Sequence, residues 1–326
     1  MKAMTGNAGF QEMNQLGKAK RPFLAIISYD KSKILISPLE NIDTKMCEYT
    51  FPALSNSHYT LTNETAPKLK YTPLSKSKFN KAFDIVMRHI QQGDTYLCNL
   101  SFEIPLQEDP DLNEIFRNSV AKYKIRFRED FLCFSPEIFV RIANQEIKTY
   151  PMKGTIDANL PDAEDQLLSD PKEKAEHYTI TDLLRNDLSR IAKDVNVTKF
   201  RYIDKISSAQ SNLLQSSSEI SGICKTNWQS EIGNIMNRLL PAGSITGAPK
   251  KKTMEVIAES ETHNRGFYTG VCCLFDGKTL DSFVLIRMIT KQNGQYTYKS
   301  GGGITSFSDA EKEYQEILQK IYVPVY

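Results

Sequence analysis

The sequence predicts an α+β domain built on antiparallel sheet. Apolar stretches of strand length alternate with segments of helical periodicity, and Asp276-Gly277 between two strand-like stretches is a strong hairpin signal. The 326 residues are 40% hydrophobic and 25% charged, a globular composition that can bury a large core. Hairpins favour antiparallel pairing over a doubly wound parallel sheet, and no repeat or long linker divides the chain. We therefore expect one domain.

The first part of the chain combines strands with one clear helix. Residues 22–38 have the pattern of two strands, and the polar stretch 55–70 indicates irregular structure. Helical spacing of apolar residues in 75–92 predicts an amphipathic helix that ends at Gly93, and a strand follows at 95–104. The apolar positions of this helix are Phe79, Phe83, Val86 and Ile90.

The middle of the chain predicts strands followed by a long helix. Residues 131–153 have strand patterns broken near residues 143–144, and they end in a turn that presents Lys153. A capping aspartate, a proline and a capping-box glutamate in residues 170–173 predict a helix that runs to about residue 193, with Glu176 near its start. The apolar stripe of this helix is Ile180, Leu183, Leu184, Leu188 and Ile191.

The last part of the chain predicts a hairpin and a terminal helix. Residues 266–275 and 279–290 form the two strands around the Asp276-Gly277 turn. Ser308 with Glu311 has the capping-box pattern of a last helix.

Charge and cysteine usage exclude several classes of protein. Forty-one basic and thirty-nine acidic residues give a net charge of +2, so no global field favours nucleic acid or an anionic membrane. No apolar run approaches the roughly 20 residues of a membrane helix, and the N-terminus lacks a signal-peptide core. The six cysteines show no CxxC spacing, which predicts reduced thiols. We expect a cytoplasmic protein.

Three acidic residues have the pattern of cation ligands. Glu313 and Glu316 lie one turn apart on the last predicted helix and project from the same side, which suits a hard cation. Their spacing from Lys312 and Lys320 equally fits solvated surface pairs, and spacing alone favours that interpretation. Glu176 fits either a cation ligand or a first-turn acid that complements the helix dipole.

Other residues could bind an anion or act as a nucleophile. Burial of Lys153 at a strand end would free its amine for nucleophilic attack, although most lysines have no such role. Arg287 lies in the apolar run 283–289, where a guanidinium needs either a ligand carboxylate or an internal acid. The glycines 301–303 permit close approach of an anion to the backbone, and a tight turn explains them almost as well. The segment 241–250 lacks the spacing of a phosphate-binding loop.

Eight short motifs follow one another along the chain. They are Ser135-Pro136-Glu137, Pro151-Met152-Lys153-Gly154-Thr155, KEKAEH at 172–177, DLLRND at 182–187, PAGSITGAPK at 241–250, Ile286-Arg287, GGGI at 301–304 and EYQE at 313–316. In this order they resemble the motifs of the chorismate-utilising enzymes, a family that includes anthranilate, aminodeoxychorismate, isochorismate and salicylate synthases. Chance does not produce such a series, and the resemblance covers residues 75–326.

The resemblance implies a fold and a ligand set. It implies two face-packed antiparallel sheets with outer helices, in which residues 1–74 are a shortened N-terminal part of the sheet region without a regulatory domain and 75–326 are the catalytic region. It also implies Mg²⁺ bound by Glu176 and Glu316, with Glu313 close by. The implied contacts to chorismate are Arg287, Gly303, Gly302, Thr246 and Tyr268.

Within the family, Lys153 and its motif resemble aminodeoxychorismate synthases, since anthranilate synthases usually have alanine at that position. The implied reaction is amination of chorismate at C4, with Lys153 as nucleophile, Glu137 as general acid and ammonia from a glutamine amidotransferase subunit. It serves 4-aminobenzoate and folate synthesis. Two positions depart from the family pattern: Gln215 stands where a histidine is usual, and Leu97 where aminating members often have glutamine. Anthranilate synthase and a non-catalytic chorismate-binding homologue are the alternatives.

Overall fold

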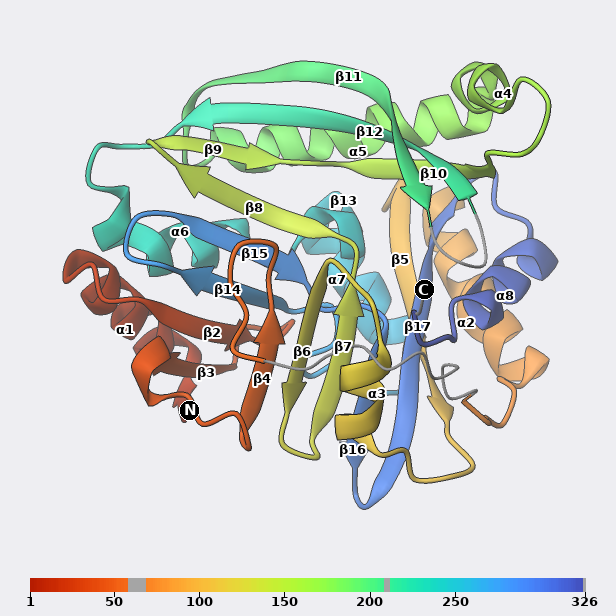
Figure 1. Ribbon diagram of the computed structural model, residues 1–326. Helices are drawn as coiled ribbons and strands as arrows, with labels where there is room; N and C mark the ends of the chain where they lie inside the picture. Colours follow the sequence, from red (N-terminus) through yellow and green to blue (C-terminus); the bar gives the residue numbers. More distant parts are fainter. Residues whose placement is uncertain (58–68, 208–211, 325–326) are drawn as a thin grey trace.

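Two antiparallel sheets form the framework of the computed structural model, which describes residues 1–57, 69–207 and 212–324 (Figure 1). In the larger sheet the strands follow the order β1 (Lys2–Thr5), β3 (Lys33–Pro38), β2 (Phe23–Ile27), β14 (Val271–Phe275), β15 (Leu280–Val284), β8 (Ile138–Ala143), β9 (Glu146–Thr149), β12 (Asn212–Ile223) and β10 (Met152–Asp157), and β11 (Lys193–Ser207) also pairs with β12. In the smaller sheet the order is β13 (Gly247–Ala248), β5 (Leu97–Pro105), β17 (Gln295–Thr305), β16 (Met288–Gln292), β7 (Phe131–Ser135), β6 (Tyr123–Phe127) and β4 (Cys47–Thr50).

The two sheets pack face to face, as the family resemblance implies. One buried cluster joins residues of both sheets, with Ile26 and Phe283 from the larger sheet and Tyr123 and Cys133 from the smaller one. Burial of apolar side chains between two inner faces is the usual core of packed sheets. The predicted α+β fold with two antiparallel sheets in a single domain is therefore confirmed.

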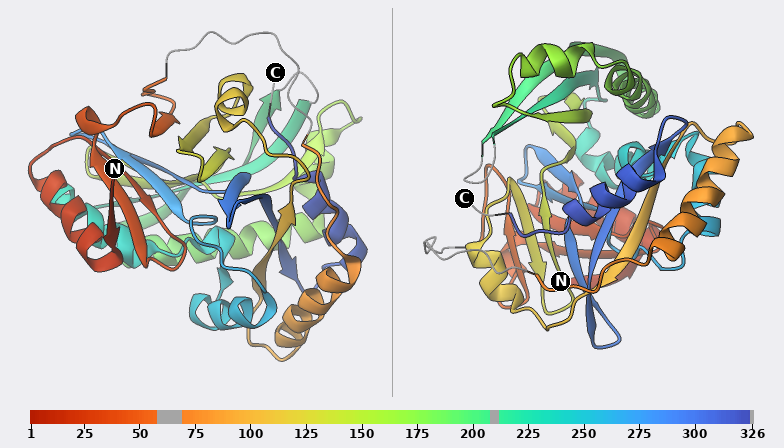
Figure 2. Two further views of the ribbon diagram at one scale, coloured as in Figure 1. Left: turned by 90° about the horizontal axis from the view of Figure 1, so that it is seen from below. Right: turned by 90° about the vertical axis from the view of Figure 1, so that its right-hand side faces the viewer.

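Helices cover the outer faces of the sheets (Figures 1 and 2). A second cluster packs α1 (Gly6–Lys18), α5 (Pro171–Ser189) and α6 (Ile232–Leu239) on the larger sheet, and a third packs α2 (Lys76–Gln91), α3 (Leu112–Asn118), α7 (Lys250–Ser260) and α8 (Ala310–Gln319) on the smaller one. The remaining short helices are α4 (Ala163–Ser169), η1 (Leu39–Asn41), η2 (Trp228–Glu231) and η3 (Gly243–Ile245). In Figure 1, α4, α5 and β10 to β12 form the upper part, and α8 lies at the right below them.

Several predicted elements are confirmed. Helix α2 begins after Ser75, whose side chain accepts a hydrogen bond from the Lys78 N–H, and it ends just before Gly93. Helix α5 begins with the predicted aspartate cap and N-terminal proline. All six cysteines are free and buried, as predicted. The predicted irregular segment at 55–70 falls mostly outside the described residues. No helix in the described ranges is long and apolar enough to cross a membrane.

Five details of the sequence prediction were wrong. The strand predicted at 266–275 begins only at Val271, because residues 266–269 form a turn. Helix α5 ends at Ser189 rather than near residue 193, because β11 already begins at Lys193. Asp309, not Ser308, caps α8. Lys153 lies in strand β10 rather than in a turn. Residues 279–290 are two strands in different sheets, β15 and β16, because the chain crosses between the sheets at Arg287 with a positive φ of 55°.

Helix α1 was not predicted. Three glycines lower its intrinsic helix propensity, so the sequence signal is weak. Its formation depends on tertiary packing: a Cβ at Gly233 would lie 1.9 Å from the Phe10 carbonyl oxygen, so α1 and α6 approach closely. The buried residues Phe10, Met13 and Leu16 of α1 then face the core.

Candidate active site

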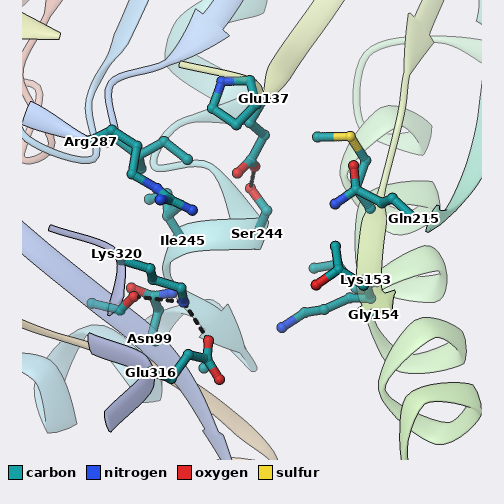
Figure 3. Close-up of a pocket in the computed structure, with 18 of the residues that line it drawn as sticks. Asn99, Glu137, Lys153, Gly154, Gln215, Ser244, Ile245, Arg287, Glu316 and Lys320 are labelled. Carbon is teal, nitrogen blue, oxygen red and sulfur yellow. Dashed lines mark hydrogen bonds and ion pairs between the residues drawn. The ribbon is translucent and has the colours of Figure 1, made fainter. Parts of the chain in front are cut away.

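A cavity of about 880 Å³ lies between the upper part of the molecule and the elements β17 and α8 (Figure 3). Lys153 on β10, Glu176 on α5 and Gln215 on β12 line one wall. Glycines 301–303 of β17 and the acids of α8 line the facing wall. The volume falls within the usual range of small-molecule sites. The cavity therefore brings together residues that lie far apart in the sequence, from Asn99 to Tyr322.

Glu137 points into this cavity from the connection between β7 and β8 (Figure 3). Its N–H donates a hydrogen bond of 3.1 Å to Ser135 Oγ, and its carboxylate accepts a short hydrogen bond from Ser244 Oγ. Burial raises the pKa of Glu137, while the Ser244 hydroxyl and the nearby Lys153 cation oppose that shift. A carboxyl group with a raised pKa can carry a proton near neutral pH and act as a general acid.

Lys153 extends from β10 into the same cavity (Figure 3). The register with β12 shifts between Lys153 and Thr155, and Gly154 between them has a positive φ of 79°, which glycine adopts without strain. Lys153 Nζ lies 3.6 Å from Glu176 Oε2, and the side chain is 24% exposed. A Cβ at Gly303 would lie 3.2 Å from the same Nζ atom. The amine is thus held against the glycine strand and not in bulk solvent.

The three candidate cation ligands come from two walls. Glu313 is 4% exposed and accepts a hydrogen bond of 2.7 Å from Ser308 Oγ. A Cβ at Gly302 would lie 3.7 Å from Glu313 Oε2 and 3.8 Å from Glu316 Oε1, so both carboxylates converge on space that the glycine leaves open. Glu176 lies across the cavity beside Lys153. In the described part of the chain, no group of three or more acidic, histidine or cysteine side chains is arranged closely enough to hold a metal ion.

Arg287 faces the cavity from the crossing between the two sheets (Figure 3). Its Nη1 atom is buried without a hydrogen-bond partner among the described residues. Its guanidinium lies 5.0 Å from the centre of the Tyr322 ring. A buried guanidinium nitrogen without a partner is unfavourable, and a ligand carboxylate would satisfy it.

The other predicted substrate contacts differ in position. Tyr268 is 3% exposed and lines the cavity, as do Gly302 and Gly303. Thr246 is fully buried next to the lining residue Ile245 and does not itself line the cavity. The roles of all these residues remain predictions.

Sequence reasoning missed Ser244 and the second contact of Lys320. The predicted pair of Lys320 with Glu316 is present and the Glu316 side chain is 51% exposed. Lys320 also lines the cavity, and it donates hydrogen bonds to Glu316 Oε1 at 2.5 Å and to the Gly301 carbonyl at 3.1 Å (Figure 3). Burial lowers the pKa of Lys320, Glu316 opposes this shift, and the neighbouring Arg287 cation acts in the same direction as burial. Ser244 lies in the family motif 241–250, of which only Thr246 was predicted to contact the substrate.

A family model described as chorismate binding enzyme matches residues 21–325. The chain belongs to this family. It is 44% identical over 323 residues to a PabA-like protein of Pasteurella multocida. The alignment covers 99% of this chain and 100% of that protein. It is 29% identical over 304 residues to aminodeoxychorismate synthase component 1 of Bacillus subtilis, with 88% of this chain and 63% of that protein covered.

Anthranilate synthases are also similar to this chorismate binding enzyme. Component 1 of the Haloarcula marismortui enzyme is 32% identical over 266 residues, covering 76% of this chain and 52% of that protein. The structure of component I from Streptococcus pneumoniae has a TM-score of 0.65 at 29% identity, covering 78% of this chain and 58% of that chain. The menaquinone-specific isochorismate synthase of Escherichia coli shares the fold, with a TM-score of 0.73 at 16% identity over 98% of this chain and 82% of that chain.

Proposed function

We propose that this chorismate binding enzyme converts chorismate and ammonia to 4-amino-4-deoxychorismate and water. The observation that carries the proposal is that Lys153 and Glu137 line one cavity with Arg287, the glycine strand and the acids of α8 (Figure 3). A nucleophile and a general acid therefore face the same bound molecule, and the site offers cationic groups for a dicarboxylate. The similarity to aminodeoxychorismate synthase component 1 supports the same reaction.

In the first step the neutral Lys153 amine attacks C2 of chorismate. Both ring double bonds shift towards C4, and the hydroxyl at C4 leaves as water after it takes the proton of Glu137. The raised pKa of Glu137 suits this role, because the acid must hold its proton until the C–O bond breaks. The product of this step is a covalent bond between Lys153 Nζ and C2.

In the second step ammonia attacks C4, both ring double bonds shift back, and the C2–N bond to Lys153 breaks. The Glu137 carboxylate recovers a proton from the incoming nitrogen, so that the enzyme returns to its starting state. The enolpyruvyl group is retained. We propose that ammonia comes from a glutamine amidotransferase subunit, as the family resemblance implies.

The chemistry of the residues present fits a magnesium ion, since carboxylate oxygens are the ligands that this ion prefers. Glu313 and Glu316 converge on the open space next to Gly302 and would hold it from there. Glu176, beside Lys153 on the opposite wall, would be the third ligand once the two walls move closer together. When bound, Mg²⁺ would neutralise the ring carboxylate of chorismate. Arg287, whose Nη1 lacks a partner among the described residues, would bind the enolpyruvyl carboxylate.

Formation of anthranilate is the nearest alternative, and the similar anthranilate synthases favour it. That reaction needs a base to remove the C2 proton and expel pyruvate. Gln215 lines the cavity where the family usually has histidine, and a neutral amide cannot act as a base. We therefore place the end of the reaction before pyruvate loss.

Product identification tests the proposal directly. The chain is incubated with chorismate, ammonium salt and Mg²⁺, and the products are analysed by mass spectrometry. We expect 4-amino-4-deoxychorismate without pyruvate. Anthranilate with pyruvate would establish the alternative reaction, and unchanged chorismate that nevertheless binds would establish a non-catalytic homologue.

A further inference from the structure

Two lysines are paired with candidate metal ligands on opposite walls of the cavity. Lys153 Nζ lies 3.6 Å from Glu176 Oε2, and Lys320 Nζ lies 2.5 Å from Glu316 Oε1. Lys320 differs from an ordinary surface pair within a helix, because its ammonium also donates to the Gly301 carbonyl of β17. This ammonium therefore connects α8 to the glycine strand, at the place where the carboxylates converge.

We propose that Lys320 couples the binding of the divalent cation to the binding of the carboxylate ligand, by competing with the cation for Glu316. This inference rests on the proposed function for the identity of both ligands. Without the carboxylate ligand, Lys320 is the counter-ion of Glu316 and weakens cation binding. When a ligand carboxylate enters, it offers the ammonium another counter-ion, and Glu316 becomes available to the cation.

The geometry around Gly302 shows why the two cations compete. A Cβ built there would lie 3.7 Å from Glu313 Oε2, 3.8 Å from Glu316 Oε1 and 3.8 Å from Lys320 Nζ. A divalent cation held by these carboxylates would lie within a few ångströms of the ammonium. Like charges a few ångströms apart repel strongly where protein partly excludes water. The ammonium must therefore leave Glu316 when the cation binds.

Coupling of this kind is reciprocal. If the carboxylate ligand strengthens cation binding by some factor, the cation must strengthen ligand binding by the same factor. Arg287 can hold a first carboxylate throughout, because its free Nη1 does not depend on the acids of α8. A dicarboxylate such as chorismate has a second carboxylate with which Lys320 can pair. The two ligands then bind cooperatively through one side chain.

Calorimetric titration with Mg²⁺, with and without chorismate, tests the proposal in full-length Lys153→Ala protein, which cannot form the covalent adduct. We expect the further substitution Lys320→Met to tighten Mg²⁺ binding about fivefold without chorismate, the effect of removing one competing ion pair. Chorismate should tighten Mg²⁺ binding to the Lys153→Ala parent and have little effect once Lys320 is replaced. Lys312→Met is the matched control: Lys312 lines the same cavity from the same helix and forms no ion pair among the described residues, so it reports the general effect of one lost charge.

Several outcomes would overturn the proposal. They are equal or weaker Mg²⁺ binding by Lys320→Met, an undiminished effect of chorismate in that variant, an equal effect of Lys312→Met, and the absence of Mg²⁺ binding in every protein. In a protein that already carries Glu316→Gln, Lys320→Met should no longer tighten Mg²⁺ binding, because the Lys320–Glu316 ion pair is already absent. Thermal unfolding verifies each fold, and Lys320→Gln replaces the methionine variant if that one does not fold. Failure of the proposed function gives a different result: product identification then finds another product, while chorismate still tightens Mg²⁺ binding through Lys320.

Discussion

Replacement of Ser244 by alanine should change the pH dependence of the reaction in one direction. Ser244 donates a hydrogen bond to the Glu137 carboxylate and thereby lowers the pKa that burial raises. A hydrogen bond to a charged group contributes about 1.5–3 kcal/mol, and one pKa unit corresponds to about 1.4 kcal/mol. Its loss should therefore raise the pKa of Glu137 further. Since the reaction needs protonated Glu137, activity should extend to higher pH.

The assay is kcat/KM for chorismate with ammonia as the second substrate, measured across the pH range. The alkaline limb that reports Glu137 should move upward by about one unit or more in Ser244→Ala. Ser216→Ala is the control, because this serine is fully buried on β12 opposite Lys153 and its hydroxyl has no hydrogen-bond partner in the described ranges. An unchanged or lowered alkaline limb in Ser244→Ala would refute the assignment of Glu137 as the acid.

Three further predictions concern the nucleophile, the metal ligands and stability. Gly303→Ala should lower kcat about tenfold with the fold intact, because the new Cβ would lie 3.2 Å from Lys153 Nζ and displace the amine; a normal kcat would argue against Lys153 as the reacting group. Glu176→Gln and Glu316→Gln should each raise the Mg²⁺ concentration needed for half-maximal activity, and unchanged metal dependence in both would remove them as ligands. Burial lowers the pKa of His177 to about 4 from 6.5, so its stabilising contribution is complete above pH 6.5 and lost as the pH falls toward 4. At pH 5 the wild type should have lost about 2 kcal/mol of unfolding free energy relative to His177→Gln, and equal pH dependence of the two in urea titrations would contradict this.

The fold was largely predictable because its signals are local. Helix α2 combines a capping serine, helical apolar spacing and a terminal glycine, and the β14–β15 hairpin has an Asp-Gly turn. The end of β15, the second strand of this hairpin, was not predictable. The apolar run that contains Arg287 continues through the point where the chain leaves one sheet for the other, so periodicity shows no boundary there.

The candidate site was predictable only where a motif carried it. Lys153, Glu137 and the acids of α8 were found through family motifs, and spacing alone favoured surface pairs for Glu313 and Glu316. Lys320 shows why spacing alone does not identify a site residue. A lysine four residues after a glutamate has the same pattern whether the helix faces solvent or a cavity, and only the packing of α8 beside β17 decides between them. Ser244 likewise meets Glu137 only through tertiary structure.

The covalent step is the central claim, and trapping it is the most direct test. The chain is mixed with chorismate and Mg²⁺ without ammonia, quenched, digested and examined by peptide mass spectrometry. The account predicts that the peptide with Lys153 gains the mass of chorismate less one water, and that Lys153→Ala neither gains this mass nor forms product with ammonia. Product formation by Lys153→Ala at the wild-type rate would contradict the account.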